Sequence, residues 1–174
     1  MDLASAVRAI PDHPKPGIVF RDVTPLMGDP VAFEHTIRLL AEAFKTRGVD
    51  KVAGIEARGF VFGAALADRL NAGFVPIRKL GKLPAETIRR SYTLEYGEDT
   101  LEVHKDALTA GQRVLLIDDL LATGGTAAAG LELLRAVSGE LVAAAFVIEL
   151  LGLPGRATLE AMGAEVFALM TFEG

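Results

Sequence analysis

The sequence predicts an α/β fold with a mostly parallel central sheet flanked by helices. Short apolar runs typical of buried strands alternate with segments in which apolar residues recur at helical spacing, the pattern of a parallel sheet covered by helices. The chain has 174 residues, of which 51% are hydrophobic and 24% charged, which fits one packed domain and excludes a largely disordered chain. We therefore expect a single domain over residues 1–174.

The N-terminal part contains few regular elements in this prediction. A short capped helix is expected over residues 2–10. Several prolines follow and disfavour regular helix, so residues 11–28 are expected to form an ordered loop. Asp29 and Pro30 are a typical helix start, at the N-cap and the first helical position, and the helical spacing continues to Gly48.

The rest of the chain alternates between strand and helix patterns. Apolar runs predict strands over residues 52–55, 74–78, 114–117, 141–148 and 166–170. Helical spacing predicts helices over residues 59–70, 126–137 and 154–162. Residues 81–104 are polar with two short alternating runs, which suits a hairpin-like excursion. Ligands of such sheets bind at the carboxyl ends of the strands, near the point where the strand order reverses.

The most informative segment follows the strand at 114–117. Asp118 and Asp119 come at its carboxyl end, and a turn of small residues leads into the next helix. Glycines in this turn let the backbone approach a ligand, and amide groups at a helix N-terminus can converge on a phosphate. The segment has neither the lysine of a Walker A loop nor the dinucleotide-binding glycine pattern. Because carboxylates repel phosphate, we expect them to serve ribose hydroxyls or a shared magnesium ion. A tight turn with Asp119 as a helix cap is the structural alternative.

This segment resembles the motif with which type I phosphoribosyltransferases bind phosphoribosyl pyrophosphate (PRPP). The resemblance implies that Asp118 and Asp119 hold the ribose hydroxyls. It also implies that the 5-phosphate lies on the loop made of Ala122, Thr123, Gly124, Gly125 and Thr126. In that family Mg²⁺ bridges the pyrophosphate and ribose oxygens. It would be bound mainly through PRPP, with Asp118 as the candidate protein ligand.

PRPP also carries a pyrophosphate, which requires a second anion site. Arg58 lies in a loop between a strand and a helix, where its guanidinium can contact phosphate in a bidentate manner. Arg78 and Lys79 at the next strand end, and Lys82 beyond it, are interpreted as further pyrophosphate ligands. A helix-start arginine and a solvated basic loop are the structural alternatives. In the resembled family the loop at 56–59 often has an unusual backbone conformation.

Residues 16–25 resemble the N-terminal hood of the adenine phosphoribosyltransferases almost residue for residue, so residues 1–28 are expected to form a base-recognition hood. Adenine offers a ring acceptor beside an amino donor, which one amide N–H and one carbonyl can match. The resemblance implies an adenine site at Val19, Phe20, Arg21, Leu120 and Ala122.

The late part of the chain gives separate support for adenine. Phosphoribosyltransferases for 6-oxopurines usually place a lysine late in the chain to meet the base oxygen, and no lysine follows Lys105 here. We interpret this as evidence against hypoxanthine or guanine.

Residues 81–84 and 91–97 resemble the mobile catalytic loop of the adenine enzymes, so residues 81–104 are expected to close over the site. The resemblance implies that Glu95 takes the proton that leaves the purine ring and that Tyr96 completes the closed site. A surface β-hairpin is the structural alternative.

Taken together, these resemblances imply a pentosyltransferase of purine salvage that makes AMP and pyrophosphate from adenine and PRPP, in a family that is usually homodimeric. One alternative is a 6-oxopurine or xanthine phosphoribosyltransferase. Another is a nucleotide-sensing regulator that has kept the fold and lost the chemistry, but the phosphate loop and Glu95 are both present and no extra domain is evident.

Charge and composition limit the partners further. The formal net charge of −5 argues against broad nucleic-acid binding. The longest apolar run, at 141–148, is too short to span a bilayer. With no cysteine, disulfides and thiolate metal sites are excluded. We expect a cytoplasmic protein with no membrane or nucleic-acid partner.

Overall fold

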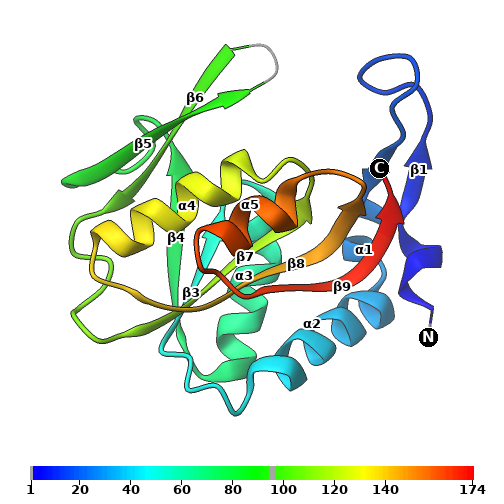
Figure 1. Ribbon diagram of the computed structural model, residues 1–174. Coiled ribbons are helices and arrows are strands. Elements are labelled where there is room, and N and C mark those ends of the chain that lie inside the picture. Colours follow the sequence, from blue (N-terminus) through cyan, green and yellow to red (C-terminus); the bar gives the residue numbers. More distant parts are fainter. Residues whose placement is uncertain (1, 95–96) are drawn as a thin grey trace.

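The computed structural model describes residues 2–94 and 97–174 (Figure 1). The helical elements are the 3₁₀-helix η1 (Leu3–Ala6), α1 (Thr24–Gly28), α2 (Pro30–Phe44), α3 (Arg58–Leu70), α4 (Gly125–Ala136) and α5 (Gly155–Ala161). The strands are β1 (Arg8–Ile10), β2 (Phe20–Asp22), β3 (Lys51–Ile55), β4 (Gly73–Lys79), β5 (Thr87–Leu94), β6 (Gly97–His104), β7 (Arg113–Leu121), β8 (Glu140–Leu151) and β9 (Val166–Glu173).

The central sheet has the strand order β5-β6-β4-β3-β7-β8-β9. The five strands from β4 to β9 in this order are mutually parallel, whereas β6 pairs antiparallel with both β4 and β5. This confirms the predicted α/β fold with a mostly parallel sheet. The hairpin-like excursion is the β5–β6 hairpin, which extends the sheet beyond β4.

Helices cover both faces of the sheet, and each face has its own core. Helices α2 and α3 pack on one face, where Phe44 and Phe62 are buried. Helix α4 packs on the other, where Leu131 and Leu134 are buried against the strands. Helix α2 begins as predicted, because the Asp29 side chain accepts the first free amides of the helix.

The N-terminal segment differs from the prediction. Only η1 forms in place of the helix over residues 2–10, and the chain then enters β1. Part of the predicted loop over 11–28 is also regular, since β2 pairs antiparallel with β1 and α1 follows. The turn between β1 and β2 contains Gly17, which has φ +86°. The Gly17 amide donates to Oδ1 of Asp12 at 2.7 Å. Residues 8–10 pair with residues 20–22 across this turn, and the periodicity of residues 2–10 alone does not reveal that partner.

Strand β7 is longer than predicted, because it continues past Ile117 to Leu121. Its neighbour β8 keeps pairing with it, so that Asp118 lies opposite Phe146 and Leu121 opposite Glu149. The two aspartates therefore belong to the strand itself and are held by the sheet.

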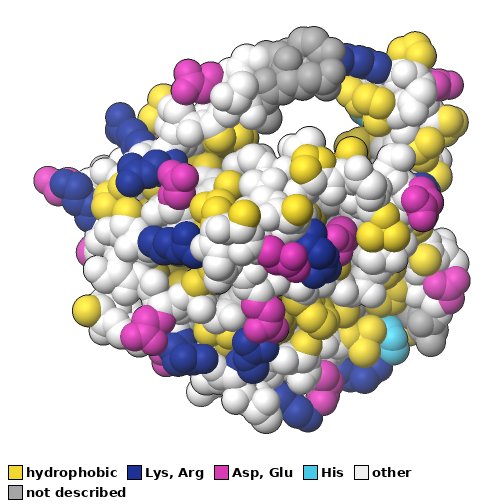
Figure 2. All heavy atoms as spheres, in the orientation of Figure 1, with side chains coloured by type: hydrophobic (Ala, Val, Ile, Leu, Met, Phe, Trp, Pro, Cys, Tyr) yellow, Lys and Arg dark blue, Asp and Glu magenta, His cyan; other side chains and the backbone are white. Residues whose placement is uncertain are grey.

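The hairpin and the N-terminal hood project from the same side of the sheet in Figure 1, and Figure 2 shows the surface hollowed between them. In the part of the chain that the structure describes, none of the helices has the length and apolar character needed to cross a membrane.

Candidate active site

The strand order reverses at β3. From β3 the chain passes to β4 on one side, and β7 lies on the other, so the connections that leave β3 and β7 diverge at their carboxyl ends. A cavity of about 240 Å³ opens there. Its lining comprises Arg58, Asp118, Asp119, Leu120, Leu121, Ala122, Thr123, Gly124, Gly125, Thr126 and Ala127. The structure thus brings the predicted acid pair, the predicted phosphate loop and Arg58 into one cavity.

The loop between β7 and α4 is tightly fixed. Gly124 has φ +88°, a conformation that L side chains rarely adopt, and a Cβ there would lie 3.0 Å from Cα of Gly155. The amide of Gly155 donates to the carbonyl of Ala122 at 3.0 Å. Among the described residues no side chain caps the N-terminus of α4, and the first residues of the helix line the cavity, so their amides are available to an anion.

The two aspartates differ in environment. Asp119 is buried, and Nε of Arg58 donates to its Oδ2. The Asp119 amide donates to Oδ1 of Asp118 at 2.9 Å. Burial, and then the charge of Asp119, raise the pKa of Asp118 well above its usual value. A ligand that donates hydrogen bonds or carries positive charge is therefore suited to this corner of the cavity.

Helix α3 approaches β7 closely because Gly59 has no side chain. A Cβ on Gly59 would lie 2.9 Å from Oδ1 of Asp118 and 2.9 Å from the carbonyl of Ile117. The Glu56–Ala57 peptide bond just before α3 is cis. This agrees with the unusual backbone conformation that the family resemblance implies for this loop.

The basic residues predicted for pyrophosphate do not form a free cationic cluster. Arg78 donates from Nε and Nη2 to the Glu56 carboxylate, both at 3.1 Å, and this pairing lowers the pKa of Glu56. Lys79 contacts Asp99, and its Nζ donates to the Tyr92 hydroxyl at 2.9 Å. Neither Arg78 nor Lys79 lines the cavity.

Lys79 stays protonated in this arrangement. Burial lowers the pKa of Lys79, but the hydrogen bonds to Asp99 and Tyr92 outweigh it and raise the pKa overall. Lys82 differs, because it is exposed and its ammonium has no hydrogen bond or ion pair within residues 2–94 and 97–174. Glu56, in the loop before α3, and Asp99, on β6, thus neutralise Arg78 and Lys79.

The predicted adenine residues fall in two places. Leu120 and Ala122 line the main cavity, but Val19 is 43% exposed and lines a neighbouring apolar cavity of about 310 Å³ with Leu150 and Leu153. The Phe20 ring lies 6.0 Å from Cζ of Arg58, so the hood reaches the edge of the site.

Arg21 points elsewhere. Its Cζ lies 4.5 Å from the Phe172 ring centroid, which joins the hood to β9. Only the Arg21 backbone therefore remains as a contact for a base.

The predicted catalytic residues Glu95 and Tyr96 lie outside the described residues. The carboxyl end of β5, just before these two residues, lies beside the phosphate loop, since a Cβ on Gly125 would lie 3.7 Å from the Thr93 carbonyl and 3.8 Å from Cδ2 of Tyr92. In the described part of the chain, no group of three or more metal-binding side chains comes together.

Three acidic residues of this region were not singled out from the sequence. Glu56 holds Arg78, Asp99 holds Lys79, and the buried Glu102 accepts amides of the segment at 82–83. The alternation of Leu101, Glu102 and Val103 could not reveal this burial, because it places Glu102 on the face opposite the core, where an acid is ordinarily solvated.

Comparison with known proteins places these features in a family. The phosphoribosyl transferase domain model matches residues 29–157. The adenine phosphoribosyltransferase of Sinorhizobium medicae is 55% identical over 99% of this chain and 96% of its own length. That of Rhodopseudomonas palustris is 56% identical, with the same coverage.

Solved structures agree with the sequence comparison. The crystal structure of the adenine phosphoribosyltransferase from Thermoanaerobacter pseudethanolicus superposes with a TM-score of 0.93 at 50% identity, covering 98% of both chains. The Saccharomyces cerevisiae enzyme, crystallised with an imino-altritol bisphosphate and adenine, gives 0.90 at 42% identity over 97% of this chain and 96% of that one. The chain therefore belongs to the phosphoribosyltransferase family and, within it, to the adenine phosphoribosyltransferases.

Proposed function

We propose that the adenine phosphoribosyltransferase reaction of this chain, which makes AMP and pyrophosphate from adenine and PRPP, takes place in the cavity between β3 and β7. One observation carries this placement. A single cavity combines two aspartates with a glycine-rich loop at an uncapped helix N-terminus. A sugar phosphate presents the matching groups, hydroxyls on one side and a dianion on the other.

The ribose phosphate would be bound at two points. The amides and hydroxyls of residues 122–126 receive the 5-phosphate, favoured by the positive end of the α4 dipole. Asp118 and Asp119 accept the ribose hydroxyls. Arg58 forms an ion pair with Asp119, and the rest of its guanidinium can donate to the pyrophosphate.

The remaining cations complete the pyrophosphate side. In the described part of the chain the exposed Lys82 ammonium makes no hydrogen bond or ion pair, which supports its role as a direct ligand. Arg78 and Lys79 must release, or share with, Glu56 and Asp99 in order to contact the pyrophosphate. We therefore place Arg78 and Lys79 at the rim of the pyrophosphate site and Lys82 within it.

The base is proposed to lie between the hood and the phosphate loop. Backbone groups around Val19 and Arg21 read the edge of adenine, and Phe20 packs near its ring. Leu120 and Ala122 face the ring from the cavity.

The reaction breaks the bond between C1 of the ribose and the pyrophosphate oxygen, through a transition state with oxocarbenium character. A ring nitrogen of adenine attacks from the opposite face and forms the new bond to C1. Cations stabilise the leaving pyrophosphate, and the phosphate loop with the aspartates holds the ribose still. Glu95 takes the proton that leaves the purine ring, and Tyr96 and the closed hairpin keep water out.

Magnesium fits this site as a partner of PRPP. The cavity offers aspartate oxygens, the ligands that Mg²⁺ prefers, yet too few for a protein-only cage. Asp118 is the candidate protein ligand, and PRPP oxygens would provide the rest. When bound, the ion neutralises charge on the pyrophosphate.

The organisation of the protein is part of the proposal. We propose one catalytic domain over residues 1–174, with residues 1–28 as the hood and 81–104 as the closing loop. A homodimer is proposed from the family resemblance. A cytoplasmic location is proposed as well, since charged phosphate esters such as PRPP do not cross membranes unaided.

A direct assay tests the assignment. The protein is incubated with Mg²⁺ and PRPP beside adenine, hypoxanthine, guanine or xanthine, and the nucleotide formed is identified. AMP formation that is lost in Asp118→Asn and in Gly124→Val supports the placement. Full activity of both variants would exclude this cavity as the site.

A further inference from the structure

Glu102 is a buried carboxylate outside the cavity, with only 1% of its surface exposed. It lies on β6, directly opposite Arg78 of β4 and Arg89 of β5. Its strand neighbours Leu101 and Val103 point to the other face and are fully buried in the core beneath α4. An ionised group buried this deeply is stable only when the protein supplies its hydrogen bonds.

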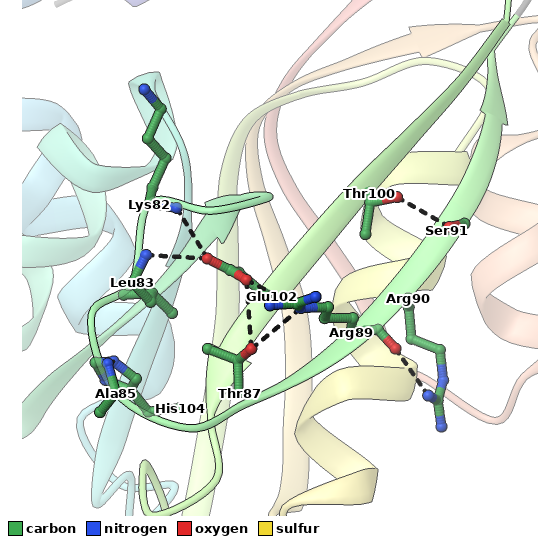
Figure 3. Close-up of polar contacts among 10 residues, drawn as sticks. All are labelled: Lys82, Leu83, Ala85, Thr87, Arg89, Arg90, Ser91, Thr100, Glu102 and His104. Atoms are coloured by element: carbon green, nitrogen blue, oxygen red, sulfur yellow. Dashed lines mark hydrogen bonds and ion pairs between the residues drawn. The ribbon is translucent and has the colours of Figure 1, made fainter.

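Both oxygens of Glu102 are used (Figure 3). Oε1 accepts the backbone amides of Lys82 and Leu83, each at 2.9 Å. Oε2 accepts the Thr87 hydroxyl at 3.3 Å and lies 3.4 Å from Nε of Arg89. Burial raises the pKa of Glu102, but these backbone amides outweigh it and lower the pKa overall, so the group is ionised at neutral pH.

The same turn is held from its other side. Nη1 of Arg78 donates to the carbonyl of Lys82 at 3.0 Å, and Arg78 is itself held by Glu56 in the loop before α3. Lys82 is therefore fixed at both its amide and its carbonyl by charged side chains. Its own side chain is exposed and extends away from the Glu102 carboxylate in Figure 3.

This arrangement fixes the Lys82 backbone, from which the side chain extends. A lysine side chain is flexible, so the location of its charge depends on where the backbone is anchored. Two buried or half-buried acids, Glu56 and Glu102, provide that anchor, and Glu102 also ties the turn to β5 at the base of the hairpin.

We infer that Glu102 is a positioning residue for the pyrophosphate half of PRPP, acting by holding the backbone at residues 82–83 so that the Lys82 ammonium faces the pyrophosphate. The inference rests on the role proposed above for Lys82. Glu102 does not line the cavity, and the proposed adenine site lies on the hood side of it, so we expect the effect on PRPP and pyrophosphate and not on adenine.

The test compares Glu102→Leu, which keeps a similar volume but accepts no hydrogen bond, with Glu102→Gln, which keeps one acceptor oxygen. For each variant we would measure the KM for PRPP, the KM for adenine and the inhibition constant of inorganic pyrophosphate. Because a small misplacement of a substrate-binding group can cost up to about 100-fold, we expect Glu102→Leu to weaken PRPP and pyrophosphate by about tenfold or more. The adenine KM should stay within about twofold of wild type.

Glu102→Gln keeps the inference testable if the leucine variant does not fold. A neutral acceptor is weaker than a charged one, so pyrophosphate should bind about three- to fivefold more weakly, between wild type and Leu. Wild-type pyrophosphate affinity in a folded Glu102→Gln or Glu102→Leu protein overturns the inference. So does an equal loss of affinity for adenine.

Two controls separate the possible causes. Val103→Ala removes buried atoms at the next position of the same strand without touching residues 82–83, so it should lower stability and leave pyrophosphate affinity unchanged. A loss in Val103→Ala equal to that in Glu102→Leu would mean that destabilisation alone is responsible and overturns the inference. Lys82→Ala tests the underlying assignment. If Lys82→Ala binds pyrophosphate normally, the proposed pyrophosphate site fails; if it binds weakly while the Glu102 variants bind normally, only the positioning role fails.

Discussion

The contact between α5 and the phosphate loop offers the sharpest test of how the site is built. Gly155 begins α5, and its amide donates to the Ala122 carbonyl at 3.0 Å. In Gly155→Ala the new Cβ would lie 2.3 Å from that same oxygen and 2.8 Å from the Leu121 side chain. Since ordinary contact begins at 3.4 Å, α5 and the loop must separate by about 1 Å.

The cost follows from these distances. Overpacking of this kind costs about 1–3 kcal/mol, and the strained hydrogen bond adds about 1 kcal/mol, so we expect a loss of about 2–4 kcal/mol in the free energy of unfolding. The loop that moves is the one proposed to bind the 5-phosphate. If about 1.4 kcal/mol of that strain is relieved only at the expense of phosphate binding, the KM for PRPP rises about tenfold.

The assay needs steady-state kinetics and urea denaturation of the same protein. The KM for PRPP is measured at saturating adenine, and the KM for adenine at saturating PRPP. Leu40→Ala is the matched control, because Leu40 is fully buried on α2 and lies remote from the cavity. It should lose about 2–5 kcal/mol of stability and keep the wild-type KM for PRPP.

Two results would refute this reasoning. If Gly155→Ala lowers stability but leaves the KM for PRPP unchanged, the loop at 122–126 does not hold the phosphate. If it lowers neither, the close approach of α5 to the loop is not part of the native structure.

Three further predictions follow from the same geometry. Glu95→Gln should lower kcat by about 10²–10⁴ if Glu95 is the general base, and a folded variant within about threefold of wild type would remove it from that role. Asp119→Asn should raise the KM for PRPP by about tenfold or more and that for adenine less than about twofold, since it loses a charged hydrogen bond and its pair with Arg58; equal changes in both would contradict the ribose contact. The pKa of Glu56 is lowered chiefly by Arg78, so its share of stability is full above the unfolded pKa of about 4.3 and is lost as pH falls through the lower native value. The free energy of unfolding, measured by urea denaturation between pH 7 and pH 3, should therefore fall less steeply in Glu56→Gln than in wild type. An identical fall in both proteins would show that the pair with Arg78 does not shift the Glu56 pKa.

The phosphate loop could be predicted from the sequence because all of its determinants are local. An apolar strand, two aspartates and a Thr-Gly-Gly-Thr turn are consecutive, and the strand–turn–helix geometry follows from them. The alternation of strands and helices is equally local, which is why the parallel sheet was predicted correctly. The strands were predicted too short, since pairing between neighbours extends β7 to Leu121, β8 to Leu151 and β9 to Glu173.

The hood and the charge pairing could not be predicted in the same way, because they depend on distant partners. Strand β1 forms only because residues 20–22 return to it across a turn that contains Gly17 with positive φ. Lys79 is paired with Asp99, twenty residues along the chain, and that partner becomes evident only once β4 and β6 are known to be neighbours.

The most direct measurement is a crystal structure of the protein with AMP and pyrophosphate. We predict that the 5-phosphate of AMP lies within hydrogen-bond distance of the amides at residues 122–126, and that the ribose hydroxyls contact Asp118 and Asp119. A structure in which the phosphate binds outside the cavity, or in which both aspartates face away from the ribose, would contradict the account of this site.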